Sequence, residues 1–191
     1  MVETRDYYDA LAGYYKYIDK DWEAGVARQA VVLDSVIREF FGPTARHILD
    51  TVCGIGTQSL GLAQFGYVVS ASDISAGELQ QARAEAAKCG LCIEFSVADM
   101  RHLRQVHKQS FDIVIACDNA APHLLSDEDI LRAFQQFYEC TRPGGGCLVS
   151  VRDYADMKRG GTKFYPRTIH DADGSRIIIS TSGSLTEIAT T

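Results

Sequence analysis

The sequence of 191 residues has no long basic run and no apolar run that approaches the length of a membrane span. A transmembrane helix needs about 18 or more apolar residues in succession, and nucleic-acid-binding domains normally carry a basic patch. Nineteen Lys and Arg residues against 25 Asp and Glu residues give a formal net charge of −6. We therefore expect a protein that binds neither nucleic acid nor a membrane.

An export signal and a complete set of metal ligands are also missing. Residues 1–20 are charged and rich in tyrosine, without the apolar stretch of a secretory signal. We therefore expect a cytoplasmic protein whose six cysteines are reduced and mostly buried. Cys89 and Cys92 have the spacing of half a zinc site, but no second close pair of Cys or His follows, so we expect no metal site.

Helical and strand patterns alternate along a chain that is long enough for one domain. The expected strands cover residues 47–49, 67–71, 92–97, 111–117 and 147–151, and the expected helices cover residues 26–41, 54–65, 75–88 and 127–140, after short helices within residues 5–20. Residues 111–117 are almost continuously apolar, which is typical of a parallel strand covered on both faces. The rhythm predicts an α/β fold with a Rossmann-like, doubly wound parallel sheet.

Polar residues follow the expected strands where ligands bind in such sheets, at the carboxyl ends. Gly54 and Gly56 lie in the first strand-to-helix turn, where they would allow close approach of a ligand. Asp73 ends the second strand, where a carboxylate takes the ribose of an adenosine ligand. Asp99 could accept the adenine amino proton. A nicotinamide site is disfavoured because Ser59 stands at the third glycine of its fingerprint.

A purely structural interpretation of these residues stays open. A Gly-x-Gly turn can simply pack a helix on a strand, and Asp73 and Asp99 can each cap the segment that follows. Three carboxylates in order on three successive strand ends nevertheless favour a ligand site over three separate structural roles.

Five stretches of the sequence resemble the class I S-adenosylmethionine-dependent methyltransferases. They are LDTVCGIGTQSLGL (49–62), GYVVSASDIS (66–75), ADMR (98–101), CDNAAPHLL (117–125) and VRDY (151–154). The last two are similar to the glycine/sarcosine N-methyltransferase group. The resemblance implies a small-molecule N-methyltransferase that uses S-adenosylmethionine, with an amino acid such as glycine or sarcosine as the acceptor. An O-methyltransferase of a small metabolite, or a truncated cofactor-binding domain without turnover, are the alternatives.

The same resemblance implies roles for individual residues. The implied cofactor-binding residues are Asp50, Cys53, Gly54, Gly56, Asp73, Ile74, Asp99, Met100 and Asp118, with Tyr15, Trp22 and Arg28 in a lid. Asn119, His123 and Arg152 are the implied catalytic residues. Asn119 would touch the acceptor, His123 would polarise or deprotonate it, and Arg152 would pair with its carboxylate. Support of the loop by His123 and a surface ion pair of Arg152 are the structural alternatives.

Two features depart from the family pattern. Val52 stands where the family usually has Gly or Ala, and the family pattern continues into a further helix and two strands, whereas this sequence stops at Thr191. We therefore expect three parts: a helical lid segment (1–45), a cofactor-binding core (46–152), and an antiparallel hairpin or meander (153–191). The sheet would be incomplete at its C-terminal end. The outer edge of the fifth strand would be open, or covered by the tail or by a second copy in a homo-oligomer.

Overall fold

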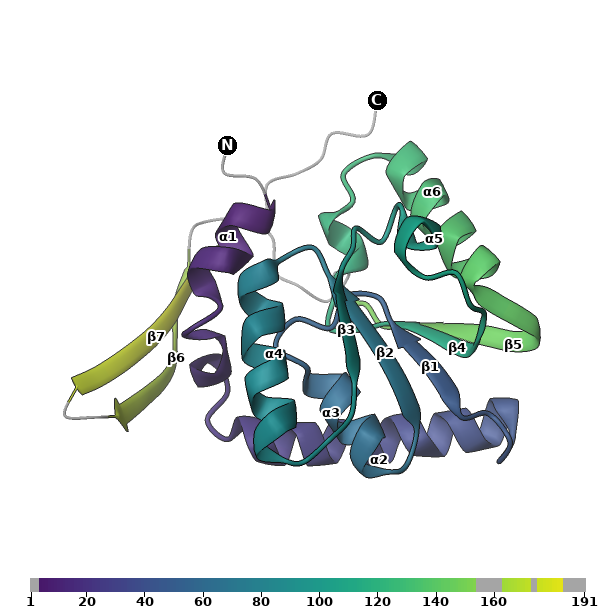
Figure 1. The fold of residues 1–191 in the computed structure, drawn as a ribbon. Coiled ribbons are helices and arrows are strands. Elements are labelled where there is room, and N and C mark those ends of the chain that lie inside the picture. The colour runs from purple at the N-terminus through teal and green to yellow at the C-terminus, as the bar shows by residue number, and fades with distance from the viewer. Residues whose placement is uncertain (1–3, 154–162, 173–174, 184–191) are drawn as a thin grey trace.

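The computed structural model describes residues 4–153, 163–172 and 175–183 of the chain (Figure 1). Its elements are α1 (Thr4–Leu11), η1 (Tyr15–Ile18), α2 (Trp22–Phe41), β1 (His47–Asp50), α3 (Thr57–Gln64), β2 (Val68–Asp73), α4 (Ala76–Lys88), β3 (Glu94–Val97), α5 (Leu103–Val106), β4 (Phe111–Ala116), η2 (Ala121–His123), α6 (Asp127–Cys140), β5 (Thr141–Val149), β6 (Lys163–Ala172) and β7 (Ser175–Gly183). None of the described helices is long and apolar enough to cross a bilayer.

Five parallel strands form the central sheet in the order β3-β2-β1-β4-β5. The α/β prediction is therefore confirmed. The strand order reverses between β1 and β4, and the carboxyl ends of the strands beside such a switch point form the crevice that binds ligands. Among the described strands, β5 lies at an edge of this sheet, while β6 and β7 pair antiparallel in a sheet of their own beside η1.

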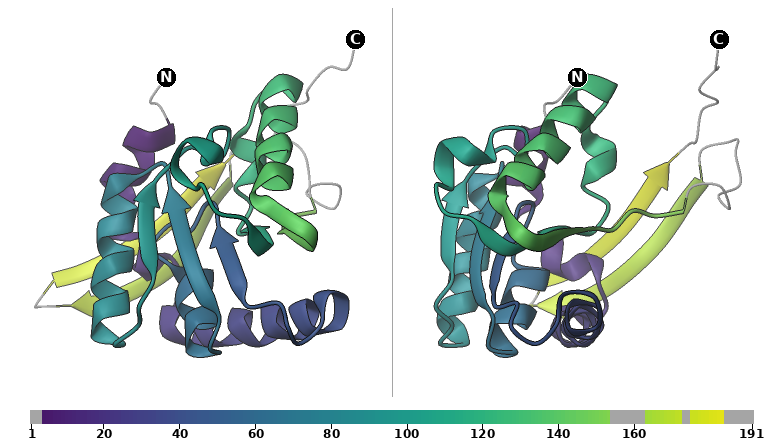
Figure 2. Two further views of the ribbon diagram at one scale, coloured as in Figure 1. Left: turned by 45° about the vertical axis from the view of Figure 1, so that its right-hand side comes forward. Right: turned by 90° about the vertical axis from the view of Figure 1, so that its right-hand side faces the viewer.

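Alternating side chains of the central strands build a core on each face of the sheet. On β1 and β4, Ile48 and Ile113 pack with α2, α3 and α4, whereas Leu49 and Val114 pack with α5 and α6. Figure 2 shows the helices on the two sides of the sheet. Every residue of β4 is buried, as expected for a strand covered on both faces. Each fully buried aliphatic side chain contributes about 1.5–3 kcal/mol to stability.

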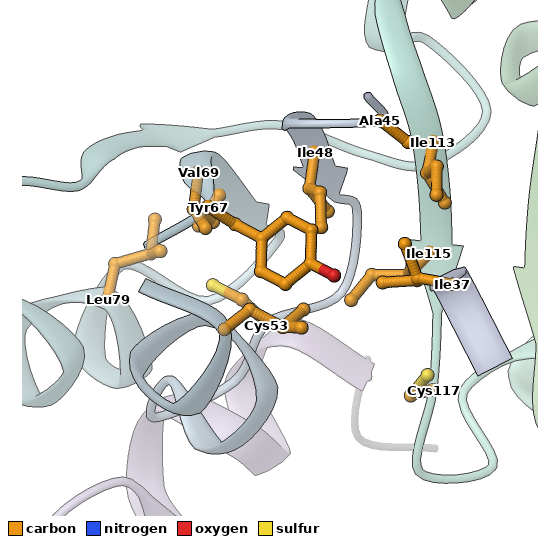
Figure 3. Packing of buried hydrophobic residues seen from close by; sticks show 12 residues of the cluster. Ile37, Ala45, Ile48, Cys53, Tyr67, Val69, Leu79, Ile113, Ile115 and Cys117 are labelled. Atoms are coloured by element: carbon orange, nitrogen blue, oxygen red, sulfur yellow. The ribbon is translucent and has the colours of Figure 1, made fainter. Parts of the chain in front are cut away.

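The core cluster under α2 and α3 includes the buried side chain of Tyr67, which carries a hydroxyl group. The ring lies among Ile48, Cys53 and Val69 (Figure 3). Its hydroxyl donates to Asp34 Oδ1 at 2.8 Å, so the buried ring keeps a hydrogen-bond partner at its tip. This contact fixes α2 against the base of the sheet.

Several element boundaries differ from the sequence prediction; α2, for example, begins at Trp22 instead of residue 26. The helix expected over residues 54–65 begins only at Thr57, because Gly54 and Gly56 have φ values of +52° and +95° that a helix does not use. The fifth strand begins at Thr141 instead of residue 147, with an irregular register opposite Phe111 and Ile113 that absorbs the extra Pro-Gly-Gly-Gly residues. It ends at Val149, two residues before the predicted end.

The expectation of mostly buried cysteines is wrong for half of them. Cys53, Cys117 and Cys140 are buried, whereas Cys89, Cys92 and Cys147 are exposed. Cys89 and Cys92 follow the end of α4 in the connection to β3, where both side chains are exposed. All six are free thiols.

Candidate functional site

A cavity of about 280 Å³ lies at the carboxyl ends of the central strands. Its lining comes from α1, η1, the turns after β1, β2, β3 and β4, and the start of α6. Eight of the predicted site residues line it: Tyr15, Gly54, Asp73, Ile74, Asp99, Met100, Asp118 and His123. The lining also includes five carboxyl groups and the guanidinium of Arg101, so the cavity is acidic.

Asp73 is fixed at the end of β2 by two backbone amides. Its Oδ2 accepts from Gly54 N and its Oδ1 from Ser75 N, both at 2.9 Å. The side chain is 7% exposed, and this burial raises the pKa of its carboxyl group. The two bonds hold the carboxylate at the entry to the turn after β1, with lone pairs left on each oxygen for a ligand.

Asp99, at the next strand end, is tied to Arg101. The Arg101 guanidinium donates to Asp99 Oδ2 at 2.6 Å and to Asp129 Oδ2 of α6 at 3.0 Å. The bonds to Arg101 lower the pKa of Asp99 despite its partial burial. The guanidinium of Arg101 therefore connects the rim of the cavity at Met100 to α6.

Asp118 and Asn119 form the turn after β4 in a left-handed conformation. Their φ values are +55° and +66°, which non-glycine residues adopt rarely and which Asn and Asp tolerate best. Gln58, which is 2% exposed, donates to Asp118 Oδ2 at 2.7 Å. Asn119 Oδ1 accepts from the backbone N–H of Arg152 at 3.0 Å, which joins this turn to the chain after β5.

The N-terminal segment closes one side of the cavity. The hydroxyl of Tyr8 and Nε2 of His123 are 2.9 Å apart, so α1 meets the loop after β4 across the cavity. Asp9 Oδ1 accepts from Ser75 Oγ at 2.6 Å and from Gly77 N at 2.8 Å at the start of α4. Figure 1 shows α1 above this end of α4. Burial raises the pKa of Tyr8 to about 12, so its hydroxyl keeps its proton.

Only part of the predicted lid segment borders the cavity. Tyr15 lines the cavity, but Trp22 and Arg28 do not. Trp22 Nε1 donates to Thr57 Oγ1 at 3.0 Å and packs against the core, and Arg28 is exposed on α2.

Five other predicted residues lie outside the cavity lining: Asp50, Cys53, Gly56, Asn119 and Arg152. Asp50 is fully buried and accepts from Ser59 Oγ at 2.6 Å, and burial raises its pKa to about 7. Gly56 packs α3 close to α4, because a Cβ there would lie 3.3 Å from the Cβ of Ala82.

The sequence reasoning missed eleven lining residues as site residues. They are Thr4, Tyr8, Val52, Glu78, Ala98, Arg101, Cys117, Ala120, Leu124, Leu125 and Asp129. The spacing of Ser75 and Glu78 in the sequence predicts a capping box at the start of α4 and does not mark Glu78 as a cavity residue. Ser75 Oγ does accept from Glu78 N at 3.0 Å, but Ser75 N donates to Asp73, so the reciprocal bond from the Glu78 side chain is not made. No local pattern marks Asp129 as a cavity residue.

Within the described part of the chain, no group of three or more His, Cys, Asp or Glu side chains is arranged to hold a metal ion. Three of the cavity's carboxyl groups are already held by other donors: Asp73 by backbone amides, and Asp99 and Asp129 by Arg101.

Comparison with known proteins gives matches to methyltransferases at the level of the domain family and of individual sequences. The methyltransferase domain family matches residues 48–145, which is 98 of the 191 residues. A glycine/sarcosine N-methyltransferase of Parasynechococcus marenigrum (strain WH8102) is 30% identical over 143 residues, covering 74% of this chain and 49% of the relative. A ubiquinone biosynthesis O-methyltransferase of Azoarcus sp. (strain BH72) is 30% identical over 110 residues, covering 58% and 46%.

The fold is also found among solved structures. DesVI of Streptomyces venezuelae has a TM-score of 0.72 at 22% identity, with 98% of this chain and 72% of that chain covered. The chain spans about half the length of the curated relatives it matches.

Proposed function

Because the chain belongs to the class I S-adenosylmethionine-dependent methyltransferases, we propose that it transfers a methyl group from S-adenosylmethionine to a small molecule. The finer proposal is N-methylation of an amino acid such as glycine or sarcosine. The observation that supports the activity best is the cavity itself, with Asp73, Asp99 and Asp118 at three strand ends around one volume.

The residues present fit this cofactor. Its sulfonium and ammonium groups are cationic, and the cavity is lined by five carboxyl groups and one guanidinium. Gly54 borders the cavity with φ of +52°, and the absence of a side chain there leaves its backbone open to a ligand. Buried carboxyl oxygens of Asp50 and Glu78 have no hydrogen-bond partner among the described residues, as expected near a binding site for a cationic, donor-rich ligand.

Within this proposal, Gly54 lies against the methionine part, with Asp50, Cys53 and Gly56 supporting the turn from beneath. Asp73 accepts the ribose hydroxyls. Ile74, Asp99 and Met100 border the adenine, and Asp118 and Tyr15 complete the cavity wall. When bound, the cofactor supplies a methyl group already activated by a sulfonium.

The chain's own task is then to orient the acceptor, to exclude water and to handle one proton. Orientation alone can contribute roughly 7–11 kcal/mol to lowering the barrier. Tyr8 and Tyr15 close the cavity from the N-terminal side, which keeps water out. His123 is the proposed group that polarises or deprotonates the acceptor, since it lines the cavity and its ring faces the hydroxyl of Tyr8.

The amino-acid version of the proposal rests on Asn119 and Arg152. The Asn119 side chain holds the backbone of Arg152 at the turn beside the cavity, so both residues lie at one edge of the site. In the proposal, the Arg152 guanidinium pairs with the carboxylate of the acceptor.

A methyl-transfer assay with labelled cofactor tests this version. Glycine and sarcosine should be methylated, and Arg152→Ala should raise their KM at least about tenfold, since a charge-assisted contact contributes about 1.5–3 kcal/mol. Arg38→Ala is the matched control, because among the described residues Arg38 forms an ion pair only with Asp34, on the exposed side of α2. An unchanged KM in Arg152→Ala would remove the amino-acid version.

The second candidate is O-methylation of a small metabolite, which the 30% identity to a ubiquinone biosynthesis O-methyltransferase supports. Phenols and carboxylates in the same acceptor panel separate it from N-methylation. A domain that binds cofactor without turnover would bind S-adenosylhomocysteine in calorimetry and methylate nothing in the panel. The cytoplasmic location, and a homo-oligomer that covers the outer edge of β5, stay predictions.

A further inference from the structure

Glu78 is a buried acid that neither the fold nor the resemblance explains. It lies in the first turn of α4, is 3% exposed and lines the cavity. Its Oε1 is buried and accepts no hydrogen bond from any described residue. A buried, unpaired carboxyl oxygen lowers the stability of a fold, so its presence at a cavity wall suggests that a ligand supplies the missing donor.

The groups around Glu78 indicate which kind of hydrogen-bond donor a ligand would supply to it. A Cβ on Gly54 would lie 3.4 Å from Oε2 of Glu78 and 4.0 Å from Oε1, and the amide of Gly54 donates to Asp73 Oδ2. The carboxyl groups of Asp73 and Glu78 therefore flank the same glycine. The described ion pairs include none between Glu78 and a Lys or Arg.

We propose that Glu78 is a second carboxyl acceptor for the ribose hydroxyls of the cofactor, beside Asp73, and that it makes the site selective for a ribose that carries both hydroxyls. This inference rests on the proposed function. Both oxygens of Asp73 already accept a backbone amide, whereas Oε1 of Glu78 accepts none of the described donors. Two neighbouring hydroxyl donors and two neighbouring carboxyl groups match in number and in chemistry.

The protonation state of Glu78 should change when this contact forms, and that change can be measured. Burial, followed by the charges of Asp73 and Asp9, raises the pKa of Glu78 to about 8. The other titratable groups coupled to it are Tyr8, Tyr15 and Cys53, whose raised pKa values keep them neutral. The ligand-free acid is thus mostly protonated at neutral pH. A hydroxyl that donates to the carboxylate favours the ionised form, so ligand binding should release a proton.

Isothermal titration calorimetry with S-adenosylhomocysteine tests the inference. The wild-type protein should bind the 2′-deoxy or the 3′-deoxy analogue at least about tenfold more weakly than the parent compound. Glu78→Met, an apolar change of similar length, should weaken binding of the parent compound about tenfold and reduce the discrimination between the analogues. Repeating the titration in buffers of different ionisation enthalpy should show proton release by the wild type that is smaller in Glu78→Met.

Thermal unfolding of ligand-free Glu78→Met separates this role from a structural one. Removing a buried carboxyl group with an unpaired oxygen should leave Tm unchanged or raise it. Glu85→Gln, on the same helix and paired with Lys88 at the surface, should match the wild type in every measurement.

The outcomes are distinct. Binding of S-adenosylhomocysteine by Glu78→Met within twofold of the wild type, with discrimination between the analogues intact, would overturn the inference and leave the proposed function standing. A fall in Tm with unchanged affinity would assign Glu78 a structural role and overturn it as well. Absence of binding by the wild-type protein would overturn the proposed function, and this inference with it.

Discussion

Gly77 controls how closely α1 can approach α4, so Gly77→Ala should release the N-terminal segment from the cavity. A Cβ on Gly77 would lie 3.1 Å from Asp9 Oδ1 and 3.2 Å from both Cα and the carbonyl oxygen of Asp9. Two of these atoms belong to the backbone of α1, so a change of side-chain rotamer cannot relieve the contact. The backbone of α1 at Asp9 must therefore shift away from α4 by a few tenths of an ångström.

The expected increase in the open population follows from the hydrogen bonds that the movement of α1 weakens. Movement of α1 weakens the bonds from Ser75 Oγ and Gly77 N to Asp9 Oδ1, at 2.6 and 2.8 Å. At about 0.5–1.5 kcal/mol for each, the closed state loses about 1–3 kcal/mol relative to the open one. That is a roughly 5- to 150-fold increase in the open population. Alanine also favours helix formation over glycine by up to about 1 kcal/mol, so the Tm of the core should not fall.

Limited trypsin digestion measures the open population through cleavage after Arg5, which lies in α1. When closing is fast relative to cleavage, the cleavage rate follows the equilibrium population of the open form. Gly77→Ala should therefore be cut at least about fivefold faster at Arg5 and bind S-adenosylhomocysteine more weakly, with an unchanged or higher Tm. Gly13→Ala is the matched control, since no atom lies within 4 Å of the Cβ it would add.

Equal protection of Arg5 in Gly77→Ala and in the wild-type protein would show that α1 adapts to the extra methyl group without opening. The contact between Asp9 and α4 would then not be what holds the segment closed.

Two further results are expected. Thermal unfolding of the ligand-free protein should occur at a lower Tm near pH 8.5 than near pH 6.5. Burial raises the pKa of Asp50 to about 7 and of Glu78 to about 8, so the folded state binds more protons than the unfolded chain and loses stability as the pH rises through this window. Burial lowers the pKa of His107 from 6.5, and its opposite contribution lies mainly below that pH. A Tm that rises between the two pH values would contradict this. Tyr8→Phe removes the hydroxyl that lies 2.9 Å from Nε2 of His123. Loss of this hydrogen bond, at about 0.5–1.5 kcal/mol, should weaken binding of S-adenosylhomocysteine about 2- to 10-fold in calorimetry. An unchanged affinity would show that this contact does not hold the site closed.

Local patterns predicted the elements of the sheet because burial on each face depends on neighbouring residues. The strand at Phe111 and the helix Asp127–Cys140 agree with the sequence prediction within one residue. Ser75 caps α4 as expected, since the bond from Glu78 N spans only three residues. The start of α3 was wrong because the backbone angles of Gly54 depend on the tight turn and not on hydrophobic spacing.

Most of the predicted site residues that line the cavity lie at strand ends, whereas the contacts between distant segments were not predicted. Asp73 and Asp99 were found because parallel strands bring their carboxyl ends together. Asp9 and Ser75 are separated by 66 residues, and Arg101 and Asp129 by 28, with no pattern in the sequence that links them. Glu78 was noticed only as a helix-capping residue, because whether a side chain at a helix start faces a cavity depends on tertiary packing.

The left-handed pair Asp118 and Asn119 limits how this protein can be engineered for new acceptors. Two successive residues with positive φ exclude β-branched side chains at both positions, because valine, isoleucine and threonine are the most strained there. Variant libraries at the turn after β4 should therefore be restricted to Asp, Asn and Gly. Diversity in acceptor choice is better sought at Ala120, Leu124 and Leu125, which line the same cavity without positive φ values.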